Sequence, residues 1–372
     1  MRYLAVLLVS VLLVGCGDSS GAPEPGNAAG TSTNPSAGTA GAVAGGGVAG
    51  GGSPSGGSAG SSAGNGGQGG TPLVAGRGGA SGGGAGVAGG GGGAGGTPAV
   101  EPPLKVMTFN LRYGTAPDGD NAWALRKPLA FDVFKRQDAD LVGIQEGLDA
   151  QLVDIDAAVA GYARIGVGRD DGKKKGEYSA IYYRTARFQV DASGTFWLSD
   201  TPEVVGSITW NTTLPRICTW AHLVDKATGY GLYHFNMHLD NASQEARDKG
   251  VALVMQRVVA RPIAQDTVIV TGDFNAGEDS VATQFMQGKA MVNGAANPLP
   301  LVDSFRAIFP DEKAVLTAHG FNGGSMGAKI DYVYMAPGQT ALAAEIDRTN
   351  DNGRYPSDHY PVTGTIQLPA AK

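Results

Sequence analysis

A glycine-rich stretch in the first hundred residues places the strongest limit on how this chain can fold. The chain has 372 residues and 60 glycines, most of which precede Thr97. From residue 17 to residue 102 the sequence consists mainly of Gly, Ala, Ser, Pro and Thr, with almost no large apolar side chains. Such a segment cannot bury enough apolar surface to offset the entropy lost when its backbone becomes ordered. We therefore predict a disordered linker over 17–102 and one folded domain over 103–372, which at about 270 residues is long enough for a large core.

The residues before this linker have the pattern of an export signal. Arg2 precedes an apolar run from Tyr3 to Val14. A run of about 12 residues is too short to span a bilayer but suits the hydrophobic region of a signal peptide. The Leu-Val-Gly-Cys sequence that ends at Cys16 resembles a bacterial lipobox, which implies that 1–16 is a lipoprotein signal and that Cys16 is lipidated. The alternative is an ordinary cleaved signal peptide in which the cysteine has no role.

The signal and the linker together predict where the protein is located. We expect an exported, cell-envelope lipoprotein that is anchored to a bacterial membrane through Cys16. Two or three acyl chains would anchor it stably, whereas one would hold only marginally. A flexible linker of this length has an end-to-end distance of roughly 50 Å, so the folded domain would reach past nearby envelope material. The other cysteine, Cys218, lies in an apolar segment, and we expect it to be a small buried strand residue.

The charge of the folded domain argues weakly against non-specific binding to nucleic acid. The formal net charge of the chain is −6. Residues 1–101 contain two arginines and three acidic residues, a net charge of −1, which leaves −5 for the remainder. A negative domain has no general attraction for a polyanion, although a local basic patch would still allow binding.

Apolar runs and alternating patterns predict an α/β domain. Asn121 is a candidate cap for a helix over 123–137, in which Pro128 requires a kink or a position near the first turn. A second helical periodicity covers 242–260. Short segments with a strand pattern occur at 104–111, 140–146, 178–183, 216–224, 230–238, 267–274, 329–335 and 360–368. Fully apolar strands mixed with alternating ones indicate two sheets packed on each other with helices outside.

Polar side chains stand at the ends of several of these apolar strands. They are Asn110, Glu146, Asp273 with Asn275, Asp331, and Asp358 with His359. Open α/β sheets place their sites at the carboxyl ends of strands, so we expect these side chains to converge. Carboxylate and carbonyl oxygens suit Mg²⁺, with Mn²⁺ or Ca²⁺ as alternatives, and no cysteine or paired-histidine motif indicates zinc. Such a cation can polarise a phosphoryl oxygen and stabilise a leaving oxyanion.

The motifs around these residues resemble those of the endonuclease/exonuclease/phosphatase superfamily. Gly-Asp-x-Asn alone would be weak evidence, but six motifs in the family's order are specific and span about 104–368. They are Met107-Thr108-Phe109-Asn110, Gln145-Glu146, Asn236-Met237-His238-Leu239-Asp240, Thr271-Gly272-Asp273-Phe274-Asn275, Ile330-Asp331-Tyr332 and Ser357-Asp358-His359. The resemblance implies that 103–372 is a catalytic domain with a DNase I-like fold. That fold is a four-layer α/β/β/α sandwich of two packed mixed sheets with the site at one end.

The resemblance also implies which residues bind the metal ion. Glu146 is expected to be the main metal ligand. Asn110 is expected to help bind the metal or the phosphate, with a purely turn-holding role as the alternative. Asp358 is expected to support the metal side of the site.

The remaining motif residues are expected to carry the hydrolysis. The resemblance implies that Asp273, assisted by Asn275, orients and activates the attacking water. His359, oriented by Asp331, would contact the scissile phosphoryl group. His238 would stabilise or protonate the leaving group, and the alternative is a strand-end histidine that pairs with a nearby acid.

Two arginines outside the motif residues are candidates for binding the substrate phosphate. Arg216 and Arg354 lie near motif segments, and a guanidinium group matches the geometry of phosphate. We expect the basic run over 169–175 to be a solvated loop, with phosphate binding as the alternative. The other histidines have no motif around them, and we expect surface or packing roles for His222, His234 and His319.

These features predict an exported, metal-dependent and monomeric hydrolase that cleaves phosphoester bonds with a water activated by Asp273. Candidate substrates are nucleic acid, nucleotides, lipid headgroups and sugar phosphates. One alternative is a 3′–5′ RNA exonuclease, because segments such as 176–179 and 353–356 resemble a secreted bacterial branch that is similar to deadenylases. Another alternative, from a different class, is a non-catalytic surface module that binds a phosphorylated envelope ligand. A sphingomyelinase-like enzyme is disfavoured because no exposed apolar insertion is evident.

Overall fold

The computed structural model describes residues 101–370. The predicted signal segment, Cys16 and the predicted linker up to residue 100 lie outside these residues. The last two residues assigned to the linker, Glu101 and Pro102, contact the folded domain, because their carbonyls accept hydrogen bonds from Gln367 and Arg187. In chain order the elements are β1 Leu104–Asn110, η1 Gly119–Asn121, α1 Trp123–Gln137, β2 Leu141–Gln145, α2 Asp149–Ala158, β3 Tyr162–Ile165, β4 Ile181–Arg184, β5 Phe188–Trp197, β6 Ile217–Asp225, β7 Gly231–His238, α3 Gln244–Val259, β8 Thr267–Asp273, α4 Val281–Met286, β9 Met291–Val292, β10 Ala295–Ala296, β11 Val302–Asp303, α5 Ser304–Ile308, β12 Asp331–Met335, β13 Thr340–Ile346 and β14 Val362–Gln367. None of the helices in the described part is long and apolar enough to cross a membrane.

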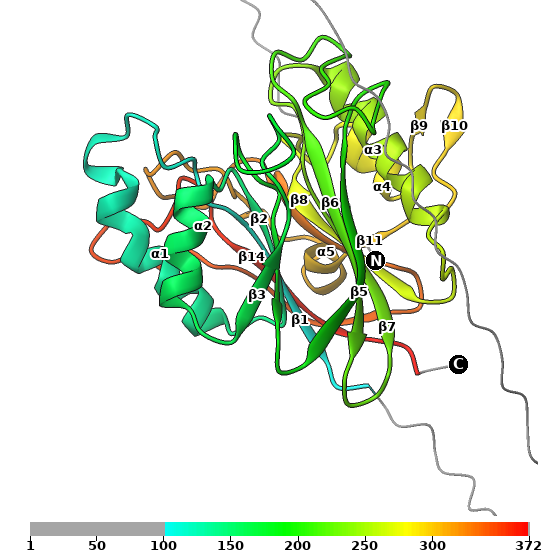
Figure 1. Ribbon diagram of the computed structural model, residues 1–372, viewed down its shortest axis with the longest axis horizontal. Helices are drawn as coiled ribbons and strands as arrows, with labels where there is room; N and C mark the ends of the chain where they lie inside the picture. Colours follow the sequence, from blue (N-terminus) through cyan, green and yellow to red (C-terminus); the bar gives the residue numbers. More distant parts are fainter. Residues whose placement is uncertain (1–100, 371–372) are drawn as a thin grey trace, which may run out of the picture. The chain divides into compact units, whose positions relative to one another are not determined.

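Two six-stranded sheets form the centre of the domain. The first has the order β13-β14-β1-β2-β4-β3, and the second has the order β11-β12-β8-β7-β6-β5. Both sheets are mixed, because β1 runs parallel to β2 and β7 parallel to β8 while the other neighbours are antiparallel. Figure 1 shows α1 and α2 outside the first sheet and α3 and α4 outside the second. The predicted four-layer α/β/β/α sandwich of two mixed sheets is therefore confirmed.

A separate apolar cluster fills each of the three interfaces between the four layers. One cluster joins α1 and α2 to the outer face of the first sheet, with Phe134 of α1 and Ile155 of α2 among its buried residues. A second cluster joins α3 and α4 to the outer face of the other sheet and contains the predicted buried cysteine, Cys218. A third lies between the two sheets. Since successive strand residues point to opposite faces, each central strand contributes to two of these clusters.

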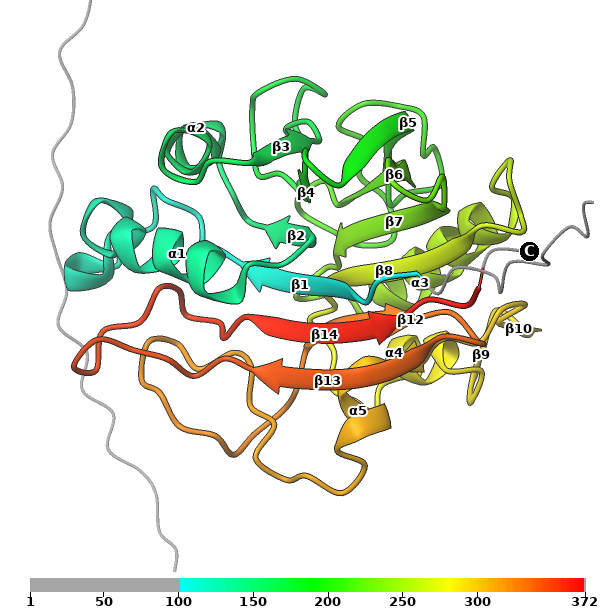
Figure 2. The ribbon, with the colours of Figure 1, turned by 90° about the horizontal axis from the view of Figure 1, so that it is seen from below.

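Along the face between the sheets, side-chain polarity changes from one end of a strand to the other. In β1 this face carries Leu104 and Val106 in the apolar cluster, then Thr108, and finally Asn110 at the end of the strand. Figure 2 shows β1 in the middle of its sheet, with β14 and β2 on either side. The apolar end stabilises the packing of the two sheets, and the polar end is the part of the interface that carries the predicted site.

A buried network of neutral polar side chains separates these two ends. Gln145 of β2 donates to Asn236 of β7 at 2.7 Å, and Thr271 of β8 donates to the same Asn236 oxygen at 3.0 Å. Gly143 allows this close approach, because a Cβ atom there would lie 2.2 Å from Thr271 Oγ1. Buried polar groups that are fully hydrogen-bonded fix one relative placement of the layers that carry them. The network therefore sets how the two sheets sit beneath the site.

The predicted elements are largely confirmed, with several corrections. The helix over 123–137 is confirmed, but Asn121 does not cap it: Ala122 is the N-cap, and no side-chain cap hydrogen bond forms. Pro128 lies inside this helix, beyond its first turn. The predicted strand over 178–183 begins later, at Ile181. The sequence patterns missed α2, β3, β5 and β13, among other short elements.

Candidate active site

Strand register brings the predicted site residues together at one end of the sandwich. In the second sheet, Asp273 at the end of β8 pairs with His238 of β7 on one side and with Asp331 of β12 on the other. In the first sheet, Asn110 ends β1, and Glu146 follows the neighbouring strand β2. Asn110 Nδ2 spans the gap between the sheets, because it donates to Glu146 Oε1 at 3.1 Å and to Asp273 Oδ2 at 2.9 Å. Side chains from both sheets therefore share one site.

Three residues at this site have positive φ values that residues other than glycine seldom adopt. They are Arg112 (φ 55°), Glu146 (φ 61°) and Asn275 (φ 47°), each one or two residues beyond the end of a strand. Such a conformation costs on the order of 1–3 kcal/mol and persists only where the surroundings fix it. Here the backbone N–H of Tyr113 donates to Glu146 Oε2 at 3.0 Å, and that of Asn275 donates to Asp273 Oδ1 at 2.8 Å. These turns and hydrogen bonds therefore fix the orientation of the Glu146 and Asp273 carboxylates.

Asp273 has the environment that a general base requires. Its side chain is buried, and burial together with the neighbouring Asp331 carboxylate raises the pKa of Asp273 to about 7. A base is most effective when its pKa lies near the working pH. Because Oδ1 and Oδ2 accept hydrogen bonds from Asn275 and Asn110, the orientation of the carboxylate is fixed. This environment suits the water-activating role predicted from the sequence.

His359 and Asp331 form a buried pair beside Asp273. His359 Nδ1 donates to Asp331 Oδ2 at 2.9 Å and lies 3.9 Å from Asp273 Oδ2. Burial alone would lower the pKa of His359, but Asp331, Asp273 and Asp358 reverse this effect and raise it well above its usual value. At neutral pH His359 is therefore a cation, which suits a contact with a phosphoryl group.

Replacing Asp331 by Asn should shift the pH optimum of hydrolysis to lower pH. The substitution removes a carboxylate that raises the pKa of both His359 and Asp273. The cation of His359 would then be lost at a lower pH, and the carboxylate of Asp273 would also form at a lower pH. We expect kcat/KM at the wild-type optimum to fall roughly 10- to 100-fold, as is typical when a partner that orients a histidine is removed. A profile of kcat/KM against pH with an unchanged or more alkaline optimum would contradict this prediction.

His238 lies between the carboxylate of Asp273 and the guanidinium of Arg216. Its Nε2 is 3.6 Å from Asp273 Oδ2 and 3.0 Å from Asn275 Nδ2. Arg216 Nη1 lies 3.3 Å from both ring nitrogens of His238, and Arg216 Nε donates to Asp240 Oδ2 at 3.2 Å. Burial, reinforced by nearby arginines, lowers the pKa of His238 well below its usual value, so the ring is neutral. Of the two arginines proposed for phosphate binding, Arg216 is thus brought to the site.

The expectation of a solvated loop over 169–175 is wrong for its first residue. Arg169 is only 5% exposed and forms two hydrogen bonds of 2.8 Å with Glu177. Glu177 Oε2 in turn lies 3.8 Å from His238 Nδ1. An arginine can be buried when a bidentate carboxylate partner compensates its charge. The rest of the run behaves as expected, because Asp170, Asp171 and the lysines over 173–175 are exposed. Sequence reasoning placed Arg169 near the site only through the alternative that the run over 169–175 binds phosphate, and it gave Glu177 no role in the site.

The donor atoms at this end of the sandwich fit a divalent cation. Two groups of described side chains have ligand atoms within 4.8 Å of one another: Glu146 with His238 and Asp273, and Asp273 with Asp331 and His359. Oδ1 of Asp331 is also buried without a hydrogen-bond partner in residues 101–370. A carboxylate oxygen in that position requires a proton, a water molecule or a cation. Because carboxylate oxygens dominate the donor set, a hard cation fits best.

Two predicted site residues, Asp358 and Arg354, lie outside the two groups of possible metal ligands. Asp358 belongs to neither group of possible ligands, and its Oδ2 lies 3.7 Å from Arg112 Nε. Arg354 donates to the backbone carbonyl of Leu125 in α1 at 2.8 Å, and no described contact joins it to the residues above. The remaining histidines are buried, which confirms a packing role for His222, His234 and His319.

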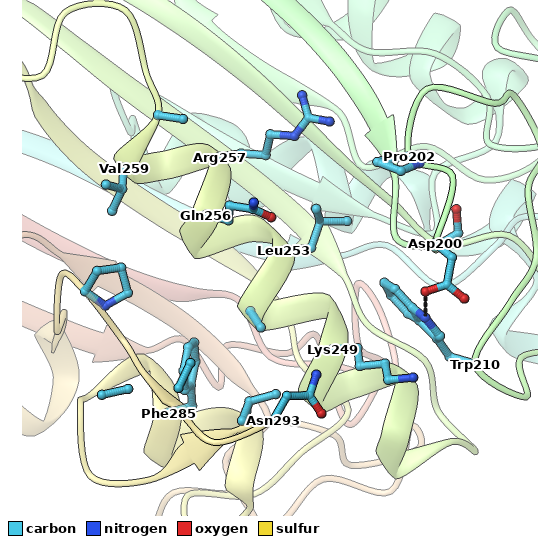
Figure 3. Close-up of a pocket in the computed structure, with 17 residues that line it drawn as sticks. Asp200, Pro202, Trp210, Lys249, Leu253, Gln256, Arg257, Val259, Phe285 and Asn293 are labelled. Atoms are coloured by element: carbon cyan, nitrogen blue, oxygen red, sulfur yellow. Dashed lines mark hydrogen bonds between the residues drawn. The ribbon is translucent and has the colours of Figure 1, made fainter.

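A large open groove lies elsewhere on the domain. Its volume is about 1160 Å³, and it runs over the outer face of α3, with Trp210 and Phe285 among its lining residues. Figure 3 shows Lys249, Leu253, Gln256 and Arg257 of α3 along it. It contains none of the predicted site residues, so the size of a cavity does not locate the chemistry here.

Comparisons with known proteins agree with this geometry. The model of the Endonuclease/Exonuclease/phosphatase family matches residues 107–359. A solved endonuclease/exonuclease/phosphatase from Bacteroides vulgatus is 32% identical, with a TM-score of 0.65 over 72% of this chain and 100% of that one. The mannosyl-6-phosphatase of Bacteroides thetaiotaomicron is 33% identical, with a TM-score of 0.62 over 71% of this chain and 100% of that one. No curated protein sequence matched the chain.

A more distant likeness supports the fold alone. The human nocturnin catalytic domain with bound sulfate is 16% identical, with a TM-score of 0.56 over 72% of this chain and 95% of that one. The family match spans more than half of the chain and includes every motif residue assigned above from Asn110 to His359. This chain therefore belongs to the endonuclease/exonuclease/phosphatase family and is a phosphoester hydrolase.

Proposed function

We propose that the protein is a divalent-metal-dependent phosphatase that removes phosphate from sugar phosphate monoesters outside the cytoplasm. The observation that carries this proposal is the position of Asp273, a base with a pKa of about 7 held between Glu146 and His359. The choice of a sugar phosphate is supported by 33% identity to a mannosyl-6-phosphatase whose whole length this chain covers.

The metal ion would be held mainly by Glu146, next to Asn110 and Asp273. Mg²⁺ is the proposed ion, with Mn²⁺ and Ca²⁺ as alternatives, because carboxylate oxygens suit all three. When bound, such an ion polarises a phosphoryl oxygen and neutralises charge on the leaving oxygen. Glu146 Oε1 and Asp273 Oδ2 already accept hydrogen bonds from one Asn110 amide group, so two carboxylates are oriented together before an ion arrives.

The side chains around this position divide the remaining work. Asp273 accepts the proton of the attacking water, and Asn275 keeps the carboxylate in place through its backbone N–H. The cation of His359 contacts the phosphoryl oxygens and is oriented by Asp331. The ring of His238 would donate a hydrogen bond to the leaving oxygen. Because the ring is neutral, we favour stabilisation of the leaving oxygen over the alternative role, in which a protonated His238 gives its proton to the leaving group.

Export and lipidation remain part of the proposal on sequence grounds. The short apolar run before Cys16 suits a signal peptide, and the Leu-Val-Gly-Cys sequence resembles a lipobox. A lipid anchor followed by a flexible linker would keep the catalytic domain near a membrane surface. Mass spectrometry of the mature protein should find acyl chains on Cys16, and an unmodified cysteine would exclude this anchor.

A panel of phosphoesters with and without metal tests the proposed activity. The purified 101–372 domain should release phosphate from mannose 6-phosphate and related monoesters in Mg²⁺, and a chelator should abolish the release. It should act much more slowly on bis(p-nitrophenyl) phosphate and on an oligoadenylate. Shortening of the RNA from its 3′ end, without release of phosphate from sugars, would support the exonuclease alternative. A folded sample that binds these compounds but converts none of them would indicate a binding module instead.

A further inference from the structure

One buried arginine joins several loops next to the site. Arg126 belongs to the first turn of α1 and is 1% exposed. Its Nη1 donates to the backbone carbonyls of Leu111 at 2.7 Å and Pro356 at 2.9 Å. Its Nη2 donates to the carbonyl of Arg112 at 2.8 Å, and its Nε donates to that of Asn121 at 2.8 Å. Although burial lowers the pKa of Arg126 to about 10, the side chain stays protonated at neutral pH.

The carbonyls that Arg126 contacts belong to segments that lead directly into the site. Leu111 and Arg112 follow Asn110, which bridges the two carboxylates. Pro356 precedes Ser357, Asp358 and His359, and Ser357 Oγ donates to the carbonyl of Asn110 at 2.7 Å. The paired register of β1 and β14 ends at Thr108 and Val362, before either segment reaches the site. The guanidinium therefore connects these segments beyond the point where the strands pair.

We infer that Arg126 is a positioning residue of the active site, whose guanidinium fixes the turn after Asn110 against the segment that carries Asp358 and His359. This inference rests on the proposed function, because it assigns Arg126 to the side of the site where Asn110 and Glu146 would meet a metal ion. A guanidinium has five N–H donors in a fixed planar fork, so its three nitrogens can reach four separated carbonyls, whereas the three donors of a lysine radiate from one nitrogen and cannot span the same set. The role is indirect, since the described hydrogen bonds of Arg126 are to backbone carbonyls and its other described contacts are to the rings of Trp123 and Phe321.

A second arginine offers a matched control at the opposite end of the sandwich. Arg187 donates to the carbonyls of Pro102 and Pro103 at 2.9 Å each, and to the carboxylates of Asp140 and Asp225 at 2.8 Å each. These contacts lie near the start of β1, whereas those of Arg126 lie beyond its end, about 20 Å away along an extended strand. Arg187 is partly buried, whereas Arg126 is fully buried. If arginines that join separate segments merely stabilise the fold, changing either one should affect the protein in the same way.

The experiment compares Arg126→Lys and Arg187→Lys with the wild type in the purified 101–372 domain, which keeps the Pro102 carbonyl that Arg187 contacts. Thermal unfolding, Mn²⁺ affinity by isothermal titration, and kcat and KM for p-nitrophenyl phosphate are measured on each. Both variants should unfold at lower temperature. Only Arg126→Lys should bind Mn²⁺ about 10- to 100-fold more weakly and lose kcat by a similar factor, which is the usual effect of removing an outer partner of a metal site. Arg187→Lys should keep the wild-type Mn²⁺ affinity and kcat.

The outcomes separate this inference from the proposed function. A folded Arg126→Lys variant with wild-type Mn²⁺ affinity and kcat would overturn the inference. If that variant does not fold, Arg126→Gln restores some of the donors without an unpaired buried charge. Failure of both to fold, while Arg187→Lys folds, would assign Arg126 to the fold as a whole and also overturn the inference. A wild-type domain that binds Mn²⁺ but hydrolyses no phosphoester would contradict the proposed function, and the Mn²⁺ comparison would still test Arg126.

Discussion

Replacing Asp273 by Asn should lower kcat by about 10²–10⁴-fold, the range that a positioned general base contributes. The carboxamide has nearly the same shape but cannot take a proton from water. The fold should tolerate the change, because Asp273 is buried beside another acid, Asp331, and its pKa is raised to about 7. An acid with a raised folded-state pKa favours folding when protonated, and its contribution is lost as pH rises through that value. At pH 8 the variant should therefore unfold at the same temperature as the wild type or at a higher one.

Asp225→Asn is a suitable control for this substitution. Asp225 is also buried, but it pairs with Arg187 at the end of the sandwich away from the site. Its replacement should lower the unfolding temperature and leave kcat unchanged. Initial rates with p-nitrophenyl phosphate in Mg²⁺ provide the comparison. If the Asp273→Asn variant keeps more than about a tenth of the wild-type activity, Asp273 is not the general base, because the loss of rate is smaller than the usual contribution of a general base.

Replacing Glu146 by Gln should weaken metal binding by more than about 100-fold, because loss of an outer partner alone costs up to that much. The change removes the charge of the carboxylate that Asn110 and the backbone of Tyr113 orient toward the centre of the site. Activity should fall in parallel at low metal concentration. High Mn²⁺ should restore part of it, whereas added metal should not rescue Asp273→Asn. This difference distinguishes a metal ligand from a base.

Glu278→Gln serves as the control for the metal prediction. Glu278 lies three residues after Asn275 and pairs with Arg306 through two hydrogen bonds of 2.6 Å. Its loss should destabilise the domain without changing Mn²⁺ affinity measured by titration. Equal weakening in the two variants would mean that the effect of Glu146 arises from a general loss of structure at this end of the domain.

The central strands and the residues at the centre of the site were predictable, because an apolar run and the polar residue at its end are neighbours in the sequence. Apolar runs located the central strands, and polar residues such as Asn110, Asp273 and Asp331 stood at their ends. The family resemblance added the layer order and the individual roles. Strand register was not predictable from these patterns, yet it is what aligns His238, Asp273 and Asp331 across three neighbouring strands. Periodicity identifies the face on which a side chain lies but not its partner across the sheet.

The elements that the sequence analysis missed are mostly short or lie at sheet edges. β13 forms one edge of the first sheet and β5 one edge of the second. Many of their side chains are exposed, so neither segment has the continuous apolar pattern of a central strand. Helix α2 has only ten residues, with Leu152 and Ile155 as its buried apolar side chains. Tertiary contacts rather than local pattern stabilise such segments.

The supporting arginines were missed for a different reason. A charged residue in a helix or loop is ordinarily solvated, which is why Arg126 attracted no attention and Arg169 was assigned to an exposed loop. Each is buried because its partners compensate its charge: Arg126 donates to four carbonyls, and Arg169 pairs with Glu177, eight residues later. Residue type and spacing do not contain that information. It becomes visible only when the segments are folded together.

The positions of the metal ion and of the phosphate can be measured by anomalous diffraction from crystals of the 101–372 domain soaked with Mn²⁺ and phosphate. We expect a Mn²⁺ peak beside the carboxylate of Glu146, with the phosphate placed between that ion and the side chains of Asn275 and His359. A peak bound elsewhere on the domain, or a phosphate held away from Asp273, would contradict the assignment of a single metal-dependent hydrolytic site.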